Sequence, residues 1–258
     1  MQFTCESYVT LLKELHTRGY HFKNYNNWQE TDRSVILRHD VDYSLEKAVF
    51  FSEIEKSALS ECTHATYFVL VSTNFYNIHS RASKEQIHQI IDNGGIIGLH
   101  FDETQYDISD ERQMQKYVRE EADILSAVVG RKIDVVSMHR PSEKILSAEM
   151  TFPGMVNAYS GTYFKKMKYV SDSRRHWREN VDEIVESGRY PRLHILTHPF
   201  WYMQGREVSL TDTLQQAILQ ASLDCYDNLN NNFRDLDHEL SRSVIERIID
   251  KPSDWEKA

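Results

Sequence analysis

Short apolar runs rich in β-branched residues alternate along this chain with longer amphipathic stretches, and this alternation restricts its fold more than any other feature. Several runs are apolar at consecutive positions, as in strands that are buried on both faces. Such runs, alternating with helices, indicate parallel strands joined by helical crossovers. We expect strands at 34–37, 65–71, 96–99, 135–138, 155–158, 169–171 and 193–197.

Helical periodicity fills the segments between these runs. The spacing of apolar residues predicts helices over 44–58, 83–93, 110–129 and 178–187, and glycines that follow three of them are typical helix ends. About seven strands in one chain favour a barrel or partly open barrel over a small doubly wound sheet. We therefore expect one α/β domain over residues 1–258, with a barrel core at about 34–202 and extra C-terminal helices at 209–258.

Composition excludes several classes of partner. The formal charge of -9 disfavours binding to nucleic acid or to anionic membrane surfaces. No window is apolar enough to cross a bilayer, and the first residues do not resemble a signal peptide. Three cysteines without paired spacing fit a reducing compartment. We expect a cytoplasmic protein with no nucleic-acid partner and no membrane insertion, and the oligomeric state stays open.

Titratable residues follow five of the predicted strands. In parallel α/β folds, catalytic groups lie at the carboxyl ends of the strands. A single His or Asp at such a position is more often a core hydrogen-bonding group or a helix cap, but five at the same rim predict one site. The residues are Asp40 and Asp42 after the first strand, His100, Asp102 and Glu103 after the third, His139 and Arg140 after the fourth, Asp172, and His198.

Asp40 and Asp42 form the most informative pair. Residues two apart on a strand point to the same face. Two adjacent carboxylates repel each other, so they favour a bound cation or a shared proton. With His100 and one further donor, they predict a divalent transition metal. Mixed His and carboxylate ligands suit zinc as the first choice, and also iron, cobalt, nickel or manganese.

These residue types are sufficient for amide hydrolysis. A metal with an open position acidifies water and polarises a carbonyl group. A carboxylate can then accept a proton from the attacking water, and a His can protonate the departing amine. The same set would also serve other metal-assisted hydrolyses, so the chemistry alone does not name the substrate.

The order and content of these motifs resemble the NodB-homology polysaccharide deacetylases, carbohydrate esterase family 4. More narrowly, they resemble its cytoplasmic branch with a His-Asp-Val-Asp start, which is associated with bacterial surface-polysaccharide biosynthesis. The resemblance covers roughly residues 34 to 202. It implies a distorted (β/α) barrel with fewer than eight strands and a metal-dependent deacetylase activity.

The resemblance also implies roles for the first two motifs. Asp40 matches the catalytic base and Asp42 a metal ligand, although the intervening Val41 leaves the opposite assignment open. His100 matches the first of two His ligands that stand four residues apart in the family. The second position is Thr104 here, and a hydroxyl is a poor zinc ligand.

The third protein ligand must therefore come from another residue. Asp102 is the first candidate because it would share a strand face with His100, and His139 and Glu103 are the alternatives. Loss of the second His is also compatible with a weak metal site, or with a non-catalytic sugar-binding or assembly protein on the same fold.

The remaining motifs match the family's acid and its supporting residues. Arg140, followed by a proline, would pair with Asp40 and keep it ionised. Asp172 would orient the general acid, His198, which lies in a Leu-x-His motif. Trp177 would form a wall of the acyl pocket, and core packing is an equally good explanation for it.

Aromatic and basic residues near the same rim predict the substrate. Trp201 and Tyr202, together with the preceding Phe200, would stack on a sugar ring or cover the barrel mouth. Arg175, within the basic group 174–178, would meet a diphosphate or belong to a solvated helix start. The function expected is removal of an N-acyl group, first of all acetyl, from a nucleotide- or lipid-linked amino sugar that is a precursor of a surface polysaccharide such as O-antigen. An amidohydrolase of small cyclic amides would share most of these residues.

Overall fold

Eight parallel strands form one sheet in the computed structural model, which describes residues 1–29, 32–59, 62–143 and 150–250. Seven of them run in the order β6-β5-β4-β3-β2-β8-β7, and β1 pairs with the first part of β2. The strands are β1 (His21–Lys23), β2 (Ser34–Val41), β3 (Thr66–Leu70), β4 (Ile96–Phe101), β5 (Val135–Met138), β6 (Val156–Asn157), β7 (Lys168–Ser171) and β8 (Arg192–Thr197).

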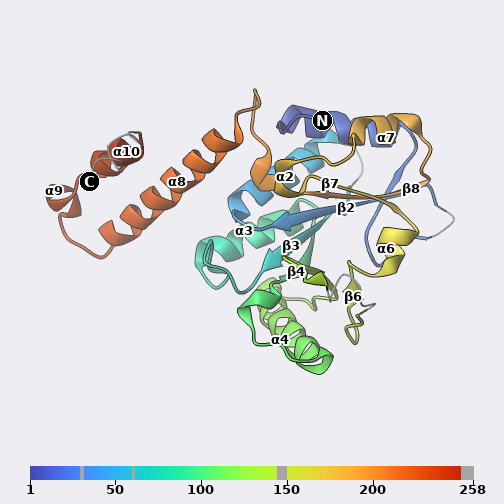
Figure 1. The fold of residues 1–258 in the computed structure, drawn as a ribbon. Helices are drawn as coiled ribbons and strands as arrows, with labels where there is room; N and C mark the ends of the chain where they lie inside the picture. The colour runs from blue at the N-terminus through green and yellow to red at the C-terminus, as the bar shows by residue number, and fades with distance from the viewer. Residues whose placement is uncertain (30–31, 60–61, 144–149, 251–258) are drawn as a thin grey trace. The chain divides into compact units, whose positions relative to one another are not determined.

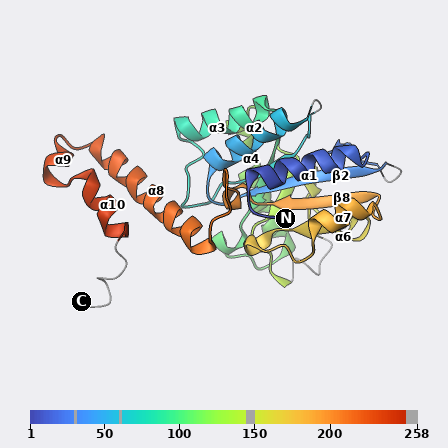
Figure 2. The same cartoon turned by 90° about the horizontal axis from the view of Figure 1, so that it is seen from above.

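The sheet curls into an open barrel with β6 and β7 at its edges (Figure 1). The expectation of a distorted α/β barrel of about seven parallel strands is confirmed. The α-helices described within residues 1–205 are α1 (Cys5–Thr17), α2 (Leu45–Ala58), α3 (Arg81–Asp92), α4 (Glu111–Val129), α6 (Gly161–Lys165) and α7 (Val181–Ser187). Helices α2 and α3 lie side by side over the outer face (Figure 2). Helix α1 and strand β1 were not expected from the sequence.

Local signals place the helices close to their predicted bounds. Ser44 accepts a hydrogen bond from the backbone N–H of Lys47 and starts α2, and Asp110 does the same for Gln113 in α4. Gly130 ends α4 with a positive φ of 76°, a conformation that glycine adopts without a steric cost.

The chain divides into two compact units, residues 1–205 and 206–258. The second unit holds α8 (Leu210–Asn230), α9 (Leu236–Glu239) and α10 (Arg242–Asp250). Two helices were expected at 209–258, and the last eight positions lie outside the described residues. The single domain remains a prediction. Among the described residues, no helix has the length and apolarity that a bilayer crossing requires.

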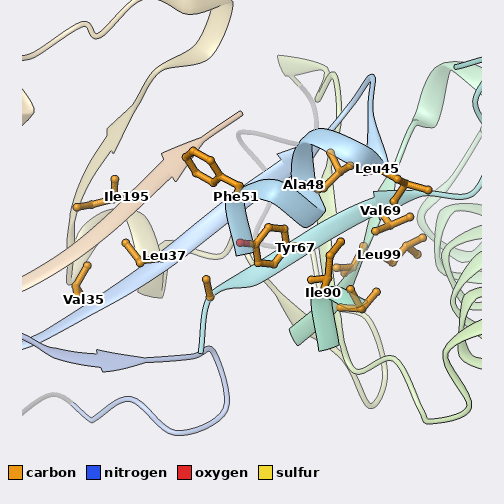
Figure 3. Packing of buried hydrophobic residues seen from close by; sticks show 14 of the residues in the cluster. Val35, Leu37, Leu45, Ala48, Phe51, Tyr67, Val69, Ile90, Leu99 and Ile195 are labelled. Carbon is orange, nitrogen blue, oxygen red and sulfur yellow. The ribbon is translucent and has the colours of Figure 1, made fainter. Parts of the chain in front are cut away.

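Strand β2 separates two regions of the core. Val35 and Leu37 pack on the outer face with Phe51 of α2, as Figure 3 shows. Ile36, on the opposite face, belongs to a smaller cluster inside the barrel that includes Phe68 of β3. Because side chains alternate between the faces of a strand, the inner face of β2 continues from Ile36 to the charged residues at its carboxyl end.

His194 of β8 lies in this inner region and is fully buried. Its Nε2 is 2.8 Å from the Tyr25 hydroxyl, and aromatic rings surround it. Burial, together with the positive charge of Arg38, lowers the pKa of His194 to about 3. Between about pH 6.5 and pH 3, His194 is therefore neutral in the folded protein and protonated in the unfolded chain.

Acid should therefore destabilise the protein through His194. The unfolded chain takes up the proton below about pH 6.5 and the folded protein only near pH 3, so stability falls as the pH drops through this window. From about pH 7 to about pH 4.5 the expected loss from this residue is about 2–3 kcal/mol. Urea unfolding of the wild type and of His194→Gln at both pH values checks it. An equal loss in the variant would contradict the assignment.

Candidate metal and hydrolytic site

Three ligand atoms from three strand ends converge at the carboxyl rim of the barrel. Asp42 Oδ1 lies 3.2 Å from His100 Nε2 and 3.2 Å from His139 Nδ1, and the two ring nitrogens are 3.2 Å apart. Asp42 follows β2, His100 is in β4, and His139 follows β5. Among the described residues, these three form the one group of His, Cys, Asp or Glu with the spacing of a metal site.

This triangle fits a tetrahedral cation. Zinc ligands about 2.0–2.1 Å from the metal lie roughly 3.3 Å from one another in a tetrahedral arrangement. Asp42 Oδ1 is buried and accepts no hydrogen bond within the described part of the chain, so its lone pairs remain for a cation. Three protein ligands also leave a fourth position open, as in catalytic zinc sites. The residues present therefore fit the metal that the sequence predicts.

Asp40 lies beside the triangle and is held by Arg38. The guanidinium of Arg38 donates from Nε and Nη2 to the two oxygens of Asp40 at 2.8 Å each, and both side chains are buried. Burial raises the pKa of Asp40, but the charge of Arg38 and those of two nearby histidines outweigh it and lower the pKa. Arg38 also donates to Ser137 of β5, so the guanidinium is anchored on a second strand.

Arg140 does not pair with Asp40, which corrects the expectation from the sequence. Its Nη2 donates instead to Asp102 Oδ2 at 2.5 Å and to Thr104 Oγ1 at 3.0 Å. The side chain of Arg140 is 59% exposed, whereas Asp40 lies in the buried interior that Arg38 already fills. Arg38 was missed, although its position two residues before Asp40 on one strand places both on the same face.

Asp102 is likewise not directed at the triangle. Its Oδ1 accepts from the backbone N–H and the hydroxyl of Thr104, and its Oδ2 accepts from Gln105 and Arg140. Asp102 therefore caps the short helix η1 (Glu103–Gln105), and this corrects its placement as first candidate for the third ligand. His139, the alternative, occupies the third corner of the triangle.

His198 follows β8 and faces the triangle from the other side. Its Nδ1 lies 2.6 Å from Asp172 Oδ1, and its Nε2 lies 3.7 Å from Asp42 Oδ2. Burial lowers the pKa of His198, but the charge of Asp172 and the hydrogen bond to it outweigh burial and raise the pKa to about 9. The structure thus brings Asp172 and His198 together as expected from the sequence.

Tyr202 supports this pair and is not exposed at the rim. Its hydroxyl donates to Asp172 Oδ2 at 3.1 Å, and the side chain is 1% exposed. The expected contact of Tyr202 with a sugar is therefore corrected, because its polar end is already engaged in the interior. Trp177 is half-buried and packs against the hydrophobic cluster that contains Val35 and Leu37. Arg175 lies with its guanidinium 5.3 Å from the ring of Phe3, and its contact with a substrate stays a prediction.

Aromatic rings from three strand ends gather next to the metal ligands. The ring of Tyr43, which follows Asp42, lies 4.7 Å from those of Phe75 and Phe200, and 6.1 Å from that of Trp201. Trp201 is mostly covered, whereas Tyr43 is 36% and Phe75 62% exposed. Of the four, Phe200 and Trp201 were expected near the substrate, while Tyr43 and Phe75 were missed because they lie in loops without periodicity.

Comparisons with known proteins match the chain only at the level of solved structures. No family model matches it, and no curated protein matches significantly. The peptidoglycan deacetylase PdaC from Bacillus subtilis is 15% identical over 80% of this chain and 100% of its own, with a TM-score of 0.42.

Two further solved structures show the same degree of likeness. A CE4 family pseudoenzyme from Bacillus anthracis is 17% identical, covering 74% of this chain and 61% of its own, with a TM-score of 0.44. A chitin deacetylase from the fungus Colletotrichum lindemuthianum is 13% identical over 72% of this chain and 81% of its own, with a TM-score of 0.42. With TM-scores below 0.5, the case for function rests on the side chains described above.

Proposed function

We propose that this protein is a metal-dependent hydrolase that removes an N-acyl group from an amino sugar. The observation that carries the proposal is the convergence of three metal-ligating side chains with a base and an acid on either side. The base is Asp40, which is held by Arg38, and the acid is His198, which is held by Asp172. A cation on the three ligands would polarise the amide carbonyl and acidify a water molecule.

Asp40 is suited to be the general base. Its ion pair with Arg38 favours the ionised form, which can accept a proton from the attacking water. The bidentate contact also fixes the direction of the carboxylate. Asp40 Oδ2 lies 3.5 Å from His100 Nε2, so the base is adjacent to a metal ligand.

His198 is suited to protonate the departing amine. Asp172 receives the Nδ1–H of the imidazole, so that Nε2 is directed toward the rim where the substrate would bind. Asp172 is held in turn by the backbone N–H of His198 and by Tyr202. The imidazole ring is therefore oriented by Asp172 at the end of β7, and Asp172 is itself held by groups that follow β8.

Replacing His198 with glutamine should lower kcat by about 100-fold to 10,000-fold, the range for loss of a general acid. The metal content should not change, because His198 is not one of the three converging ligands. Elemental analysis and steady-state kinetics of the variant test both parts. Asp172→Asn should show a smaller loss of kcat in the same direction. Wild-type kcat in His198→Gln would remove the residue from the mechanism.

We infer further that the substrate is a soluble or lipid-linked precursor of a surface polysaccharide, such as a nucleotide-linked N-acetylamino sugar. The exposed rings of Tyr43 and Phe75 offer apolar surface to a sugar next to the metal ligands. The three cysteines are free in the structure, which suits the cytoplasmic location proposed for such a precursor. Zinc is the metal proposed, because His and carboxylate ligands in a tetrahedral arrangement suit it.

Metal content followed by acetate release tests the proposed function. About one transition metal per chain, lost in Asp42→Ala and in His100→Ala, would establish the centre. Release of acetate from N-acetylated amino sugars by the metal-loaded wild type would establish the reaction. Cyclic amides serve as the competing substrates. Full metal content with sugar binding but no release from any of these compounds would favour a non-catalytic sugar-binding protein.

A further inference from the structure

Glu55 of α2 is a buried carboxylate that the proposed reaction does not use. It lies behind the sheet and is 3% exposed. Its Oε1 accepts from the Tyr8 hydroxyl at 2.5 Å and lies 2.8 Å from His39 Nε2. Its Oε2 accepts from the hydroxyls of Thr63 at 3.1 Å and Tyr67 at 2.8 Å. Both oxygens are thus surrounded by hydrogen-bond donors.

The surroundings of Glu55 determine the tautomer of His39. Because the carboxylate accepts hydrogen bonds, His39 Nε2 must carry the proton that points to it. In the neutral imidazole His39 Nδ1 then accepts, and the Thr197 hydroxyl at 2.6 Å donates to it. A continuous hydrogen-bonded chain therefore runs from α2 through β2 to β8, on the face of the sheet opposite the metal ligands.

Register places this chain directly behind the catalytic groups. Tyr67, His39 and Thr197 are paired across β3, β2 and β8, so they form one row on the outer face. Asp40 and His198 are the next residues after His39 and Thr197, and their side chains point to the other face. Among the described residues, no hydrogen bond joins Asp40 or Asp42 to His198; the closest approach is the 3.7 Å between Asp42 and His198.

We propose that His39 and Thr197, held by Glu55, are positioning residues that set the separation between the base Asp40 and the acid His198. The hydrogen bond between His39 and Thr197 holds β2 and β8 at the level of the reacting groups, and Glu55 fixes the His39 ring against α2. The inference rests on the proposed function for the roles of Asp40 and His198. Of the metal ligands, His100 and His139 come from β4 and the end of β5, outside this row, and Asp42 follows β2 two residues beyond Asp40.

Thr197→Val tests the proposal, because it removes the hydroxyl and keeps the shape of the side chain. We expect kcat to fall by about tenfold to 100-fold, the range for a small misplacement of reacting groups. The KM and the metal content should stay at wild-type values. Thr197→Ser restores the hydroxyl and should restore kcat, which a role in packing alone does not predict.

Thr66→Val is the matched control. Thr66 is a buried threonine in the neighbouring strand β3, 1% exposed, and its hydroxyl has no hydrogen-bond partner in the described part of the chain. This variant should keep wild-type kcat. An equal loss of kcat in Thr66→Val, or wild-type kcat in Thr197→Val, would overturn the proposal.

A second measurement separates this proposal from the proposed function. The imidazole NMR signals of His198 in the metal-loaded protein need no substrate. They should shift in Thr197→Val and remain unchanged in Thr197→Ser and Thr66→Val. If the wild type hydrolyses none of the N-acyl compounds tested, the proposed function fails. The His198 signals then still decide whether His39 and Thr197 position His198, and unshifted signals in Thr197→Val would overturn that proposal.

Discussion

Replacing His139 with alanine should reduce metal affinity by more than about 100-fold and abolish turnover. Loss of a residue that only supports a ligand costs about 10–100-fold in affinity or activity, so loss of one of three converging ligands should cost more. The prediction follows from the 3.2 Å that separates His139 Nδ1 from both Asp42 Oδ1 and His100 Nε2. Metal titration with a competing chelator and steady-state kinetics measure the two effects.

Asp102→Asn is the control that makes this result informative. The sequence placed Asp102 ahead of His139 as a ligand, whereas the structure directs its carboxylate to Thr104, Gln105 and Arg140. We expect this variant to bind metal as the wild type does. If Asp102→Asn loses the metal and His139→Ala retains it, the triangle is assigned to the wrong residues.

Replacing Arg38 with methionine should destabilise the protein by about 3–5 kcal/mol, because it leaves a buried carboxylate without its partner. Arg38 is 0% and Asp40 4% exposed, so water cannot replace the lost contacts. The pKa of Asp40, which Arg38 lowers, should rise. Since only the ionised form of Asp40 can accept a proton, the acid limb of the activity profile should move to higher pH.

Arg140→Met separates this effect from a general loss of positive charge at the rim. The side chain of Arg140 is 59% exposed, and its partner Asp102, although 4% exposed, keeps its hydrogen bonds from Thr104 and Gln105, so the loss of stability should be smaller than in Arg38→Met. Urea unfolding and pH–rate profiles of the two variants should differ sharply. A larger loss of stability in Arg140→Met than in Arg38→Met would contradict the assignment of Arg38 as the partner of Asp40.

Much of the fold could be predicted because its signals are local. Consecutive apolar residues specify strands buried on both faces, and caps such as Ser44 and Gly130 set helix ends. The site at the carboxyl rim follows from the same pattern, since parallel strands bring their ends to one edge. Asp42, His100, Asp172 and His198 were placed there by position in the chain alone. Helix α1 and strand β1 were missed because they precede the first predicted strand at 34–37, and β1 is only three residues long.

Partner choice within the site could not be predicted in this way. Arg38 and Arg140 are both arginines near a predicted strand end. Only the packed barrel shows that Arg38 is buried against Asp40, whereas Arg140 is largely exposed and pairs with Asp102. His139 and Asp102 were both candidates for the third ligand for the same reason. A difference of a few tenths of an ångström decides whether two polar atoms form a hydrogen bond or an ion pair, and a sequence pattern does not give distances between residues far apart in the chain.

The sequence by itself determined that the strands are parallel, because strands and helices alternate along the chain. It also determined that titratable residues follow five strands, and that Asp40 and Asp42 share one face, because side chains on a strand repeat every two residues. Tertiary structure alone decided which of these groups touch. The curvature of the sheet brings β2, β4 and β5 close enough for Asp42, His100 and His139 to converge. The packing of α2 on the outer face of the sheet buries Glu55 and His39, whose contacts join one helix to three strands.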